Sequence, residues 1–145
     1  MHSYNFMYLI ILALTLGIAT FFLNDGELFN NDRVQAIEIN NAAKADLVVI
    51  NVAGQSIEFR QGNMGGSFLS SVEGRSRVVW NFYEAQKIDL GSKQFVGSLL
   101  APFAEVTHQG NIRGTTVARS LDARAGIQLP NVVSVGVWCT SIYCL

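Results

Sequence analysis

Three carboxylates and one histidine are the side chains that catalysis could use in this chain of 145 residues. Glu84, Asp89 and Glu105 lie near the ends of predicted strands, and a pair of carboxylates can serve as acid and base in glycoside hydrolysis. His108 lies in a predicted turn, and no spacing places a serine and an aspartate beside it for nucleophilic catalysis. Because scattered acids on strands form a solvated face far more often than a catalytic pair, we expect no catalytic residue and no enzyme.

The composition excludes several other kinds of chemistry. Two cysteines and two histidines are too few for a zinc module, and no glycine-rich loop joins a strand to a helix to hold a phosphate group. A net charge of −1 supplies no basic field for nucleic acid. Thr107, Thr115 and Thr116 are too few for the threonine ladder that an ice-binding face would need. We therefore expect no cofactor, no metal and no nucleic-acid partner.

The two cysteines lie close together near the carboxy terminus. Cys139 and Cys144 are five residues apart, within a C-terminal strand or tail that we place at residues 131–145. In an exported protein they could close a small disulfide loop. The spacing permits this bond without establishing it.

The first 24 residues predict a membrane or export segment. Residues 6–23 carry no charge and include only three residues that are not hydrophobic, namely Thr15, Gly17 and Thr20. A helix of this length rises about 27 Å, close to the hydrocarbon thickness of a bilayer. Because the segment is apolar on every face, we expect a helix that does not pack on the rest of the chain. It would be a transmembrane anchor or a signal peptide. A helix that caps the core is the remaining alternative.

The rest of the chain predicts β structure. The abundance of hydrophobic residues, 50%, and the small net charge exclude intrinsic disorder. Residues 25–33 are polar and rich in turn formers, so we expect a spacer. Residues 61–71 contain three glycines and predict a loop. Apolar and polar residues alternate, or form β-branched runs, at residues 34–39, 47–52, 56–59, 77–82 and 88–90.

Two neighbouring segments resemble each other at a constant offset. Residues 95–101 align with residues 112–118, an offset of 17 residues throughout. A short fixed period with glycines at the corners is typical of a β-solenoid, in which each coil stacks on the next. The sequence therefore predicts a mainly β fold, an irregular right-handed β-solenoid over residues 34–130.

The offset assigns equivalent positions in the two coils. Gly97 and Gly114 would each lie at a corner that a Cβ atom would crowd. The remaining pairs to be stacked are Ala101 with Ala118, Ala104 with Leu121 and Val106 with Ala123. We expect the two alanines Ala101 and Ala118 at inner positions.

Four segments of the chain carry a family resemblance. They are residues 52–59, 78–85, 95–106 and 110–121, and they contain Val-Ala-Gly, Trp-Asn-Phe-x-x-Ala, Gly-Ser-Leu-Leu-Ala-Pro-x-Ala-x-Val and Gly-Asn-Ile-x-Gly-x-x-Val-Ala-x-Ser-Leu. In this order they resemble the choice-of-anchor A domain, a bacterial surface domain described as ice-binding-like and adhesive. The residues that match its motifs are Gly54, Trp80, Asn81, Phe82, Ala85, Gly97, Ala101, Pro102, Ala104, Gly114 and Ala118.

The resemblance covers residues 34–123 and implies a right-handed β-solenoid outside the cell. Family domains have further strands before this region, so we expect a truncated or minimal member whose open end could pair with another chain. The matched residues are expected to be scaffold. Phe82 should fill the interior, and Pro102, which has no N–H, should lie at a coil edge or strand end.

The function that follows is non-catalytic. We expect a bacterial cell-surface adhesion or structural module on the extracellular face of the envelope, anchored in the membrane through residues 6–23 or secreted by the export machinery. Its ligand would be a matrix protein or a glycan. The alternatives are a solenoid that binds or acts on polysaccharide, and a surface subunit that assembles with itself through open strand edges.

Overall fold

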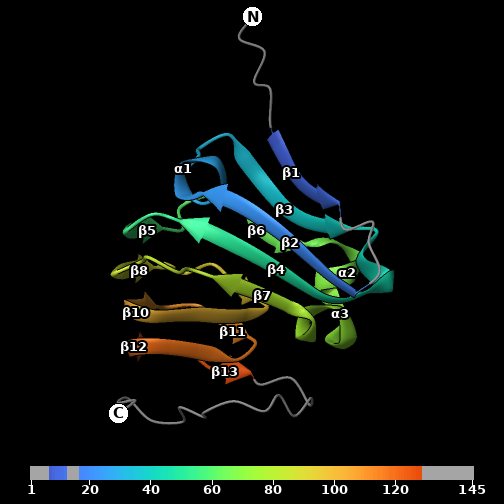
Figure 1. Ribbon diagram of the computed structural model, residues 1–145. Coiled ribbons are helices and arrows are strands. Elements are labelled where there is room, and N and C mark those ends of the chain that lie inside the picture. Colours follow the sequence, from blue (N-terminus) through green and yellow to red (C-terminus); the bar gives the residue numbers. More distant parts are fainter. Residues whose placement is uncertain (1–6, 13–16, 129–145) are drawn as a thin grey trace, which may run out of the picture.

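Parallel strands make up most of the structure, a computed structural model that describes residues 7–12 and 17–128 (Figure 1). Among the described residues, every paired strand runs parallel to its neighbour. The elements in chain order are β1 (Met7–Leu12), β2 (Gly17–Asn24), α1 (Asp25–Leu28), β3 (Val34–Asn40), η1 (Ala42–Lys44), β4 (Ala45–Ala53), β5 (Ser56–Glu58), β6 (Asn63–Gly65), α2 (Gly66–Ser70), α3 (Val72–Ser76), β7 (Val78–Asn81), β8 (Lys87–Asp89), β9 (Phe95–Val96), β10 (Ser98–His108), β11 (Ile112–Arg113), β12 (Thr116–Ala123) and β13 (Ile127–Gln128).

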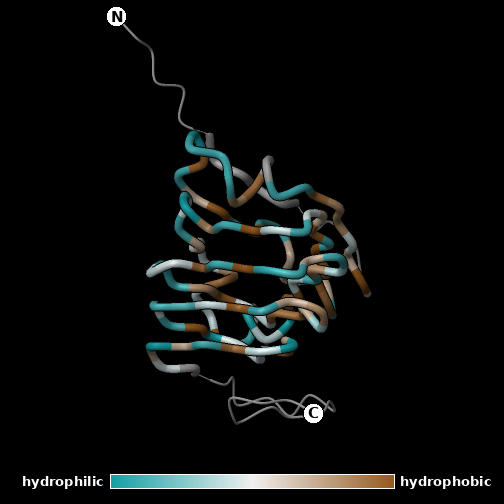
Figure 2. Tube along the Cα trace, turned by 90° about the vertical axis from the view of Figure 1, so that its left-hand side faces the viewer, coloured by the Kyte–Doolittle hydropathy of each residue, from teal (hydrophilic) through white to brown (hydrophobic). Residues whose placement is uncertain are grey.

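The strands form one large curled sheet and two small sheets around a common core. The large sheet has seven strands in the order β2-β4-β7-β10-β8-β5, with β12 paired to β10. The small sheets are β1-β3-β6 and β13-β11-β9. Figure 2 shows the chain stacked in successive layers, with hydrophobic and hydrophilic residues alternating along them. The mainly β class is confirmed, and the assignment as a right-handed solenoid stays a prediction.

The amino-terminal segment departs most from the sequence-based expectation. In place of a helix over residues 6–23, the described part of this segment forms β1, which pairs with β3, and β2, which pairs with β4. No helix in the described residues is long and apolar enough to cross a membrane. The prediction of a separate apolar helix is therefore wrong. On β2 the inward Ala19 and the outward Ile18 and Phe22 are all apolar, so the strand has no polar alternation and its sequence is as continuously apolar as that of a membrane helix.

Residues 25–33 belong to the core and do not form a polar spacer. They include α1, and Leu28 and Phe29 are fully buried. The ring of Phe29 lies edge-on against Phe59, with centroids 4.9 Å apart, and 5.9 Å from the ring of Trp80. Two apolar residues among many turn formers leave no periodic signal, and this is why the sequence pattern missed them.

Trp80 stands at the centre of the aromatic core. Its indole N–H donates a hydrogen bond of 2.9 Å to the carbonyl of Val96, and its ring lies 6.0 Å from that of Phe95. Phe82 packs on the other side of Phe29, with ring centroids 5.7 Å apart. All of these rings are fully buried, so the expected interior position of Phe82 is confirmed.

The 17-residue offset holds in the first half of the repeat and fails in the second. Phe95 pairs with Ile112, and Ala101 pairs with Ala118, as the offset requires. Beyond this point the register shifts, and Val106 pairs with Leu121. The expected pairings of Ala104 with Leu121 and of Val106 with Ala123 are therefore wrong.

A bulge around Pro102 causes the shift. After Ala101 pairs with Ala118, the next pair is Glu105 with Ser120, so β10 contains two more residues than β12 in this stretch (105 − 101 = 4 against 120 − 118 = 2). Proline cannot donate a ladder hydrogen bond, and bulges are where a strand accommodates it. Pro102 thus lies inside β10, so the strand-end alternative is wrong. It lies in the unpaired stretch between Leu100, where β10 leaves β7, and Glu105, where β10 joins β8, a position that fits the expected coil edge.

Gly97 and Gly114 let the two repeats approach closely. Gly97 has a φ of +107°, and a Cβ atom there would lie 2.8 Å from Nε1 of Trp80. At Gly114 a Cβ atom would lie 2.0 Å from the carbonyl oxygen of Gly97. The absence of a side chain at each glycine therefore allows the next layer to pack this closely.

Replacing Gly97 by alanine is expected to lower the free energy of unfolding by about 2–4 kcal/mol, because the side chain meets the Trp80 indole and the positive φ is strained. The control is Gly65→Ala, since Gly65 is extended and has nothing within 4 Å of the added Cβ. That variant should change stability by less than about 1 kcal/mol. Urea unfolding followed by circular dichroism measures both, and equal midpoints would reject the steric role of Gly97.

Replacing Phe29 by alanine is expected to cost about 3–5 kcal/mol, as for other fully buried aromatic residues. Phe103, whose side chain is 63% exposed, provides the control, and Phe103→Ala should stay within about 0.5 kcal/mol of the parent chain. Thermal unfolding of the two variants decides between a core and a spacer role for this segment. A small effect of Phe29→Ala on stability would instead support the interpretation of residues 25–33 as a polar spacer.

Candidate functional site

The candidate site is the side of the seven-stranded sheet that points away from the core, here called the outer face. Side chains alternate along a strand, so the strand register lines up the outward residues in rows. The outward members of two such rows are Thr20, Val49, Val79 and Ser98, and Phe22, Asn51, Asn81, Leu100 and Val117. None of these side chains carries a charge, and the rows combine apolar side chains with hydroxyl and amide groups.

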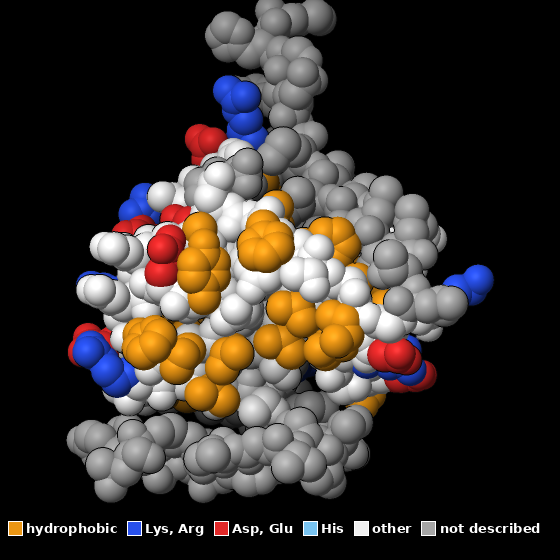
Figure 3. Space-filling view, in the orientation of Figure 1, with side chains coloured by type: hydrophobic (Ala, Val, Ile, Leu, Met, Phe, Trp, Pro, Cys, Tyr) orange, Lys and Arg blue, Asp and Glu red, His pale blue; other side chains and the backbone are white. Residues whose placement is uncertain are grey.

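Large apolar side chains are exposed on the outer face. Ile18 is 65% exposed, Phe22 75% and Phe103 63%. Figure 3 shows apolar side chains gathered over this side of the molecule, with acidic and basic side chains mostly toward its margins. One marginal ion pair joins Arg119 to Glu105 at 2.7 Å. An exposed apolar patch with a polar rim is typical of an interaction surface.

Two asparagines order the middle of the outer face. Nδ2 of Asn81 donates a hydrogen bond of 2.7 Å to Oδ1 of Asn51. Nδ2 of Asn51 donates in turn to the carbonyl of Phe21 at 3.3 Å. The three residues lie on β7, β4 and β2, so this chain of hydrogen bonds fixes the amide groups across three strands.

Most other residues of the family resemblance lie inside the molecule or at tight backbone contacts, and Pro102 is exposed in the bulge of β10. Ala85, Ala101 and Ala104 are fully buried and Ala118 is nearly so. Gly54 has a φ of +132° and donates its backbone N–H to the Glu84 carboxylate at 2.7 Å. Asn81 is the one motif residue in the two outward rows. Cys139 and Cys144 lie outside the described residues, so their disulfide stays a prediction.

The carboxylates singled out from the sequence have structural partners. Glu84 accepts from Gly54, and Asp89 accepts from the backbone N–H of Gly91 at 2.9 Å. Glu105 forms its ion pair with Arg119. No described group of three or more His, Cys, Asp or Glu side chains could hold a metal ion.

His108 is buried and does not lie in a turn. It is the last residue of β10, only 1% exposed, and its ring nitrogens make no hydrogen bond of good geometry. Burial lowers the pKa of His108, and the backbone of Asn111 and Gly91 and the charge of Asp89 only partly offset this effect. The imidazole of His108 is therefore packed inside the protein as a neutral group.

Asp25 is the titratable group that the sequence pattern did not identify. Burial, and secondarily the charge of Glu58, raise the pKa of Asp25 to about 6, and one of its carboxylate oxygens is buried without a hydrogen bond. Raised carboxyl pKa values are common at acid–base sites. In this sequence Asp25 is merely the first charged residue after an apolar run, a position that carries no signal of burial.

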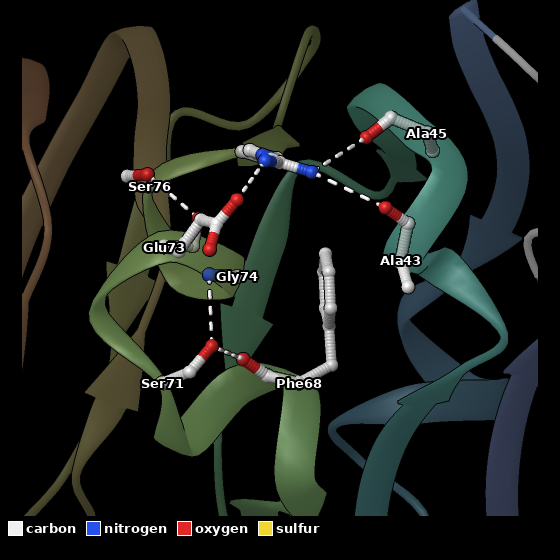
Figure 4. A network of polar contacts seen from close by, with 8 residues as sticks. Ala43, Ala45, Phe68, Ser71, Glu73, Gly74 and Ser76 are labelled. Atoms are coloured by element: carbon white, nitrogen blue, oxygen red, sulfur yellow. Dashed lines mark hydrogen bonds and ion pairs between the residues drawn. The ribbon is translucent and has the colours of Figure 1, made fainter.

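A separate groove of about 410 Å³ lies between the Asn41 turn and the helices α2 and α3. Residues 61–71, expected to be a loop, contain β6 and α2 instead. Ser71 caps α3 by accepting from the N–H of Gly74 at 2.9 Å. Figure 4 shows the side chain of Phe68 pointing upward from α2. The guanidinium of Arg77 bonds to the carbonyls of Ala43 and Ala45 and pairs with Glu73. The groove thus combines an aromatic ring with polar groups.

Stacked parallel strands with a partly apolar outer face are the architecture of this chain. A family model described as "Putative Ice-binding-like adhesive domain" matches residues 3–129, and the chain belongs to this family. The matched span includes residues 3–33, and with them β1, β2 and α1. No curated protein and no solved structure matches the chain. The ice-binding-like adhesive resemblance found in the sequence is therefore confirmed.

The raised pKa of Asp25 predicts a specific pH dependence of stability. Because the folded state binds this proton more tightly than the unfolded state, the stability that the proton contributes is present below about pH 4 and is lost as pH rises through about 6. Asp25→Asn removes the contribution. The difference in unfolding free energy between the parent chain and this variant should fall between these pH values and be constant above them.

Chemical denaturation across this pH range measures the difference. Asp46→Asn is the control, because Asp46 is an exposed carboxylate on β4. A parent-minus-variant difference that does not vary with pH for Asp25→Asn would show that the carboxyl group is not desolvated.

Proposed function

We propose that the chain is a non-catalytic adhesion module of the bacterial cell surface that binds its target through the outer face. The exposed apolar side chains of Ile18, Phe22 and Phe103, on a sheet whose two central outward rows carry no charge, are the observation that carries the proposal. Membership of an adhesive, ice-binding-like family supports an adhesion-type role. No enzyme family is implied by this membership.

The regular spacing of the outer face suits an extended target. Neighbouring strands lie about 4.8 Å apart, so the outward rows place uncharged side chains at a constant interval. A glycan chain or a matrix-protein surface offers repeated contacts of this kind. Displacement of weakly held water from apolar side chains supplies the favourable free energy, at about 25 cal/mol for each Å² of apolar area buried. Ordered amides such as Asn51 and Asn81 add orientation, because their positions are fixed before binding.

This role is consistent with the choice-of-anchor A resemblance and its right-handed β-solenoid. An extracellular location would bring the outer face to its target and would also allow a disulfide between Cys139 and Cys144. Binding through the outer face does not need residues 6–23 as a membrane helix, since β1 and β2 occupy this segment and β2 contributes Phe22 to the face.

Replacing Phe22 and Phe103 together by serine is expected to reduce binding by at least about tenfold, since both side chains are exposed on the outer face and each buries apolar area on contact. Purified full chain is applied to surfaces coated with individual glycans or matrix proteins, and retention is measured by interferometry. Val72→Ser is the matched control, because Val72 is 48% exposed on α3 and does not belong to the outer rows. Stability should be unchanged to within about 0.5 kcal/mol in both variants.

Three results would overturn the proposal. Equal retention of the double variant and the parent chain would place binding elsewhere. Loss of a concentration-dependent oligomer in the double variant, with no target bound by the parent chain, would make the outer face a self-assembly surface. Turnover of any glycan would contradict the non-catalytic role, and Asp25→Asn would then be the first variant to assay.

A further inference from the structure

We infer that the groove between the Asn41 turn and α2–α3 binds a single neutral sugar residue. The groove encloses about 410 Å³, near the lower end of the range of about 300–1,000 Å³ for small-molecule sites. This size suits one ring and part of a second. The inference is independent of the outer face, because none of the groove residues belongs to the outward rows.

The charges in the groove do not select an ionic ligand. The guanidinium of Arg77 forms an ion pair with Glu73 and donates hydrogen bonds to the carbonyls of Ala43 and Ala45, at 3.4 and 3.3 Å. Its charge and its donors on that side are already engaged, so it is poorly placed to bind a phosphate or carboxylate. Glu73 is likewise engaged by Arg77, so a cation would compete with an existing partner.

Polar side chains that make no hydrogen bond to the protein offer a ligand both donors and acceptors. Among the residues that the structure describes, the side chains of Asn40, Asn41 and Ser67 line the groove and make no hydrogen bond to protein. An amide offers two donors and one acceptor oxygen, and a hydroxyl group offers one donor and accepts as well. The hydroxyl groups of a sugar match this mixture, whereas an apolar ligand would leave all three side chains unsatisfied.

One aromatic ring supplies the apolar contact. Phe68 is half-buried, packs against the core at its base and lines the groove (Figure 4). Its ring is held between α3 and the turn at Ala43, where the Ser71 cap and the Arg77 contacts fix both walls. The C–H face of a pyranose ring packs on such an aromatic surface while its hydroxyl groups point to the rim. The wall is therefore ordered before the ligand binds, which reduces the entropy lost on binding.

The test is a titration of isotope-labelled full chain with methyl glycosides of glucose, galactose, mannose and N-acetylglucosamine, followed by amide chemical shifts. At least one glycoside should shift the amides of Ser67, Phe68 and Gly74. Ser67→Ala should weaken that binding by about three- to tenfold, the effect of losing one hydrogen bond. Phe68→Leu should weaken it by about tenfold or more, because the ring face is lost while apolar volume remains.

Ser70→Ala is the matched control, because Ser70 lies on the same helix but does not line the groove. The chain with Phe22 and Phe103 replaced by serine is a second control and should bind the sugar as the parent chain does. This separates failure of the sugar site from failure of the outer face. The inference is overturned if no glycoside shifts the groove amides, or if Ser67→Ala and Phe68→Leu bind as tightly as the parent. Shifts caused only by glucuronate or inorganic phosphate would also overturn it.

Discussion

The contact between the Trp80 indole and the backbone at Val96 and Gly97 is the constraint on which the rest of the structure depends. The indole N–H is buried and must be satisfied, and the carbonyl of Val96 satisfies it at 2.9 Å. The same approach leaves no room for a side chain at Gly97. Gly114 then closes on the carbonyl of Gly97, so one aromatic residue sets the spacing of three successive layers of chain.

The bulge around Pro102 connects this packing to the outer face. Up to Ala101 the repeat is strict, and its inward alanines stack on each other. The two additional residues in β10 then keep Ala104 buried while Phe103 stands 63% exposed. Without the bulge, the residues of β10 after Pro102 would pair with β12 at the same 17-residue offset as the residues before it. An irregularity in the ladder thereby adds an exposed aromatic side chain to the outer face while the core remains filled.

The sequence predicts features whose pattern lies within a short segment, and it misses features that depend on contacts between distant segments. The offset between Gly97 and Gly114 is visible because both coils have the same length up to this point, and it fails where Pro102 lengthens only one coil. Residues 6–23 mislead because hydrophobicity on every face fits a membrane helix as well as a strand whose inward and outward side chains are both apolar. Phe29 has no periodic neighbours to reveal its burial.

The groove and the outer face illustrate the limit of sequence patterns for function. The walls of the groove come from the Asn41 turn, from α2 and from Arg77, which are separated along the chain and meet only because β3, β6 and the start of β7 are stacked. The outer rows are likewise spread over β2, β4, β7, β10 and β12, so no single strand shows that the assembled face lacks charge. Only the strand register brings these residues together.

The inward side chains of the strands stabilise the fold, and the outward side chains form the proposed binding surface. On β2 the inward side chain of Ala19 is 5% exposed, whereas Ile18 and Phe22 are mostly exposed and contribute little to the core. Exposed apolar residues near the end of a parallel sheet favour unwanted pairing, and proteins that need only to remain soluble replace them with charges. Here the charges stand mostly at the margins and the centre of the face remains apolar (Figure 3). Folding does not require these exposed side chains, so they are free to serve the proposed contact with a target and can vary without loss of the scaffold set by Trp80.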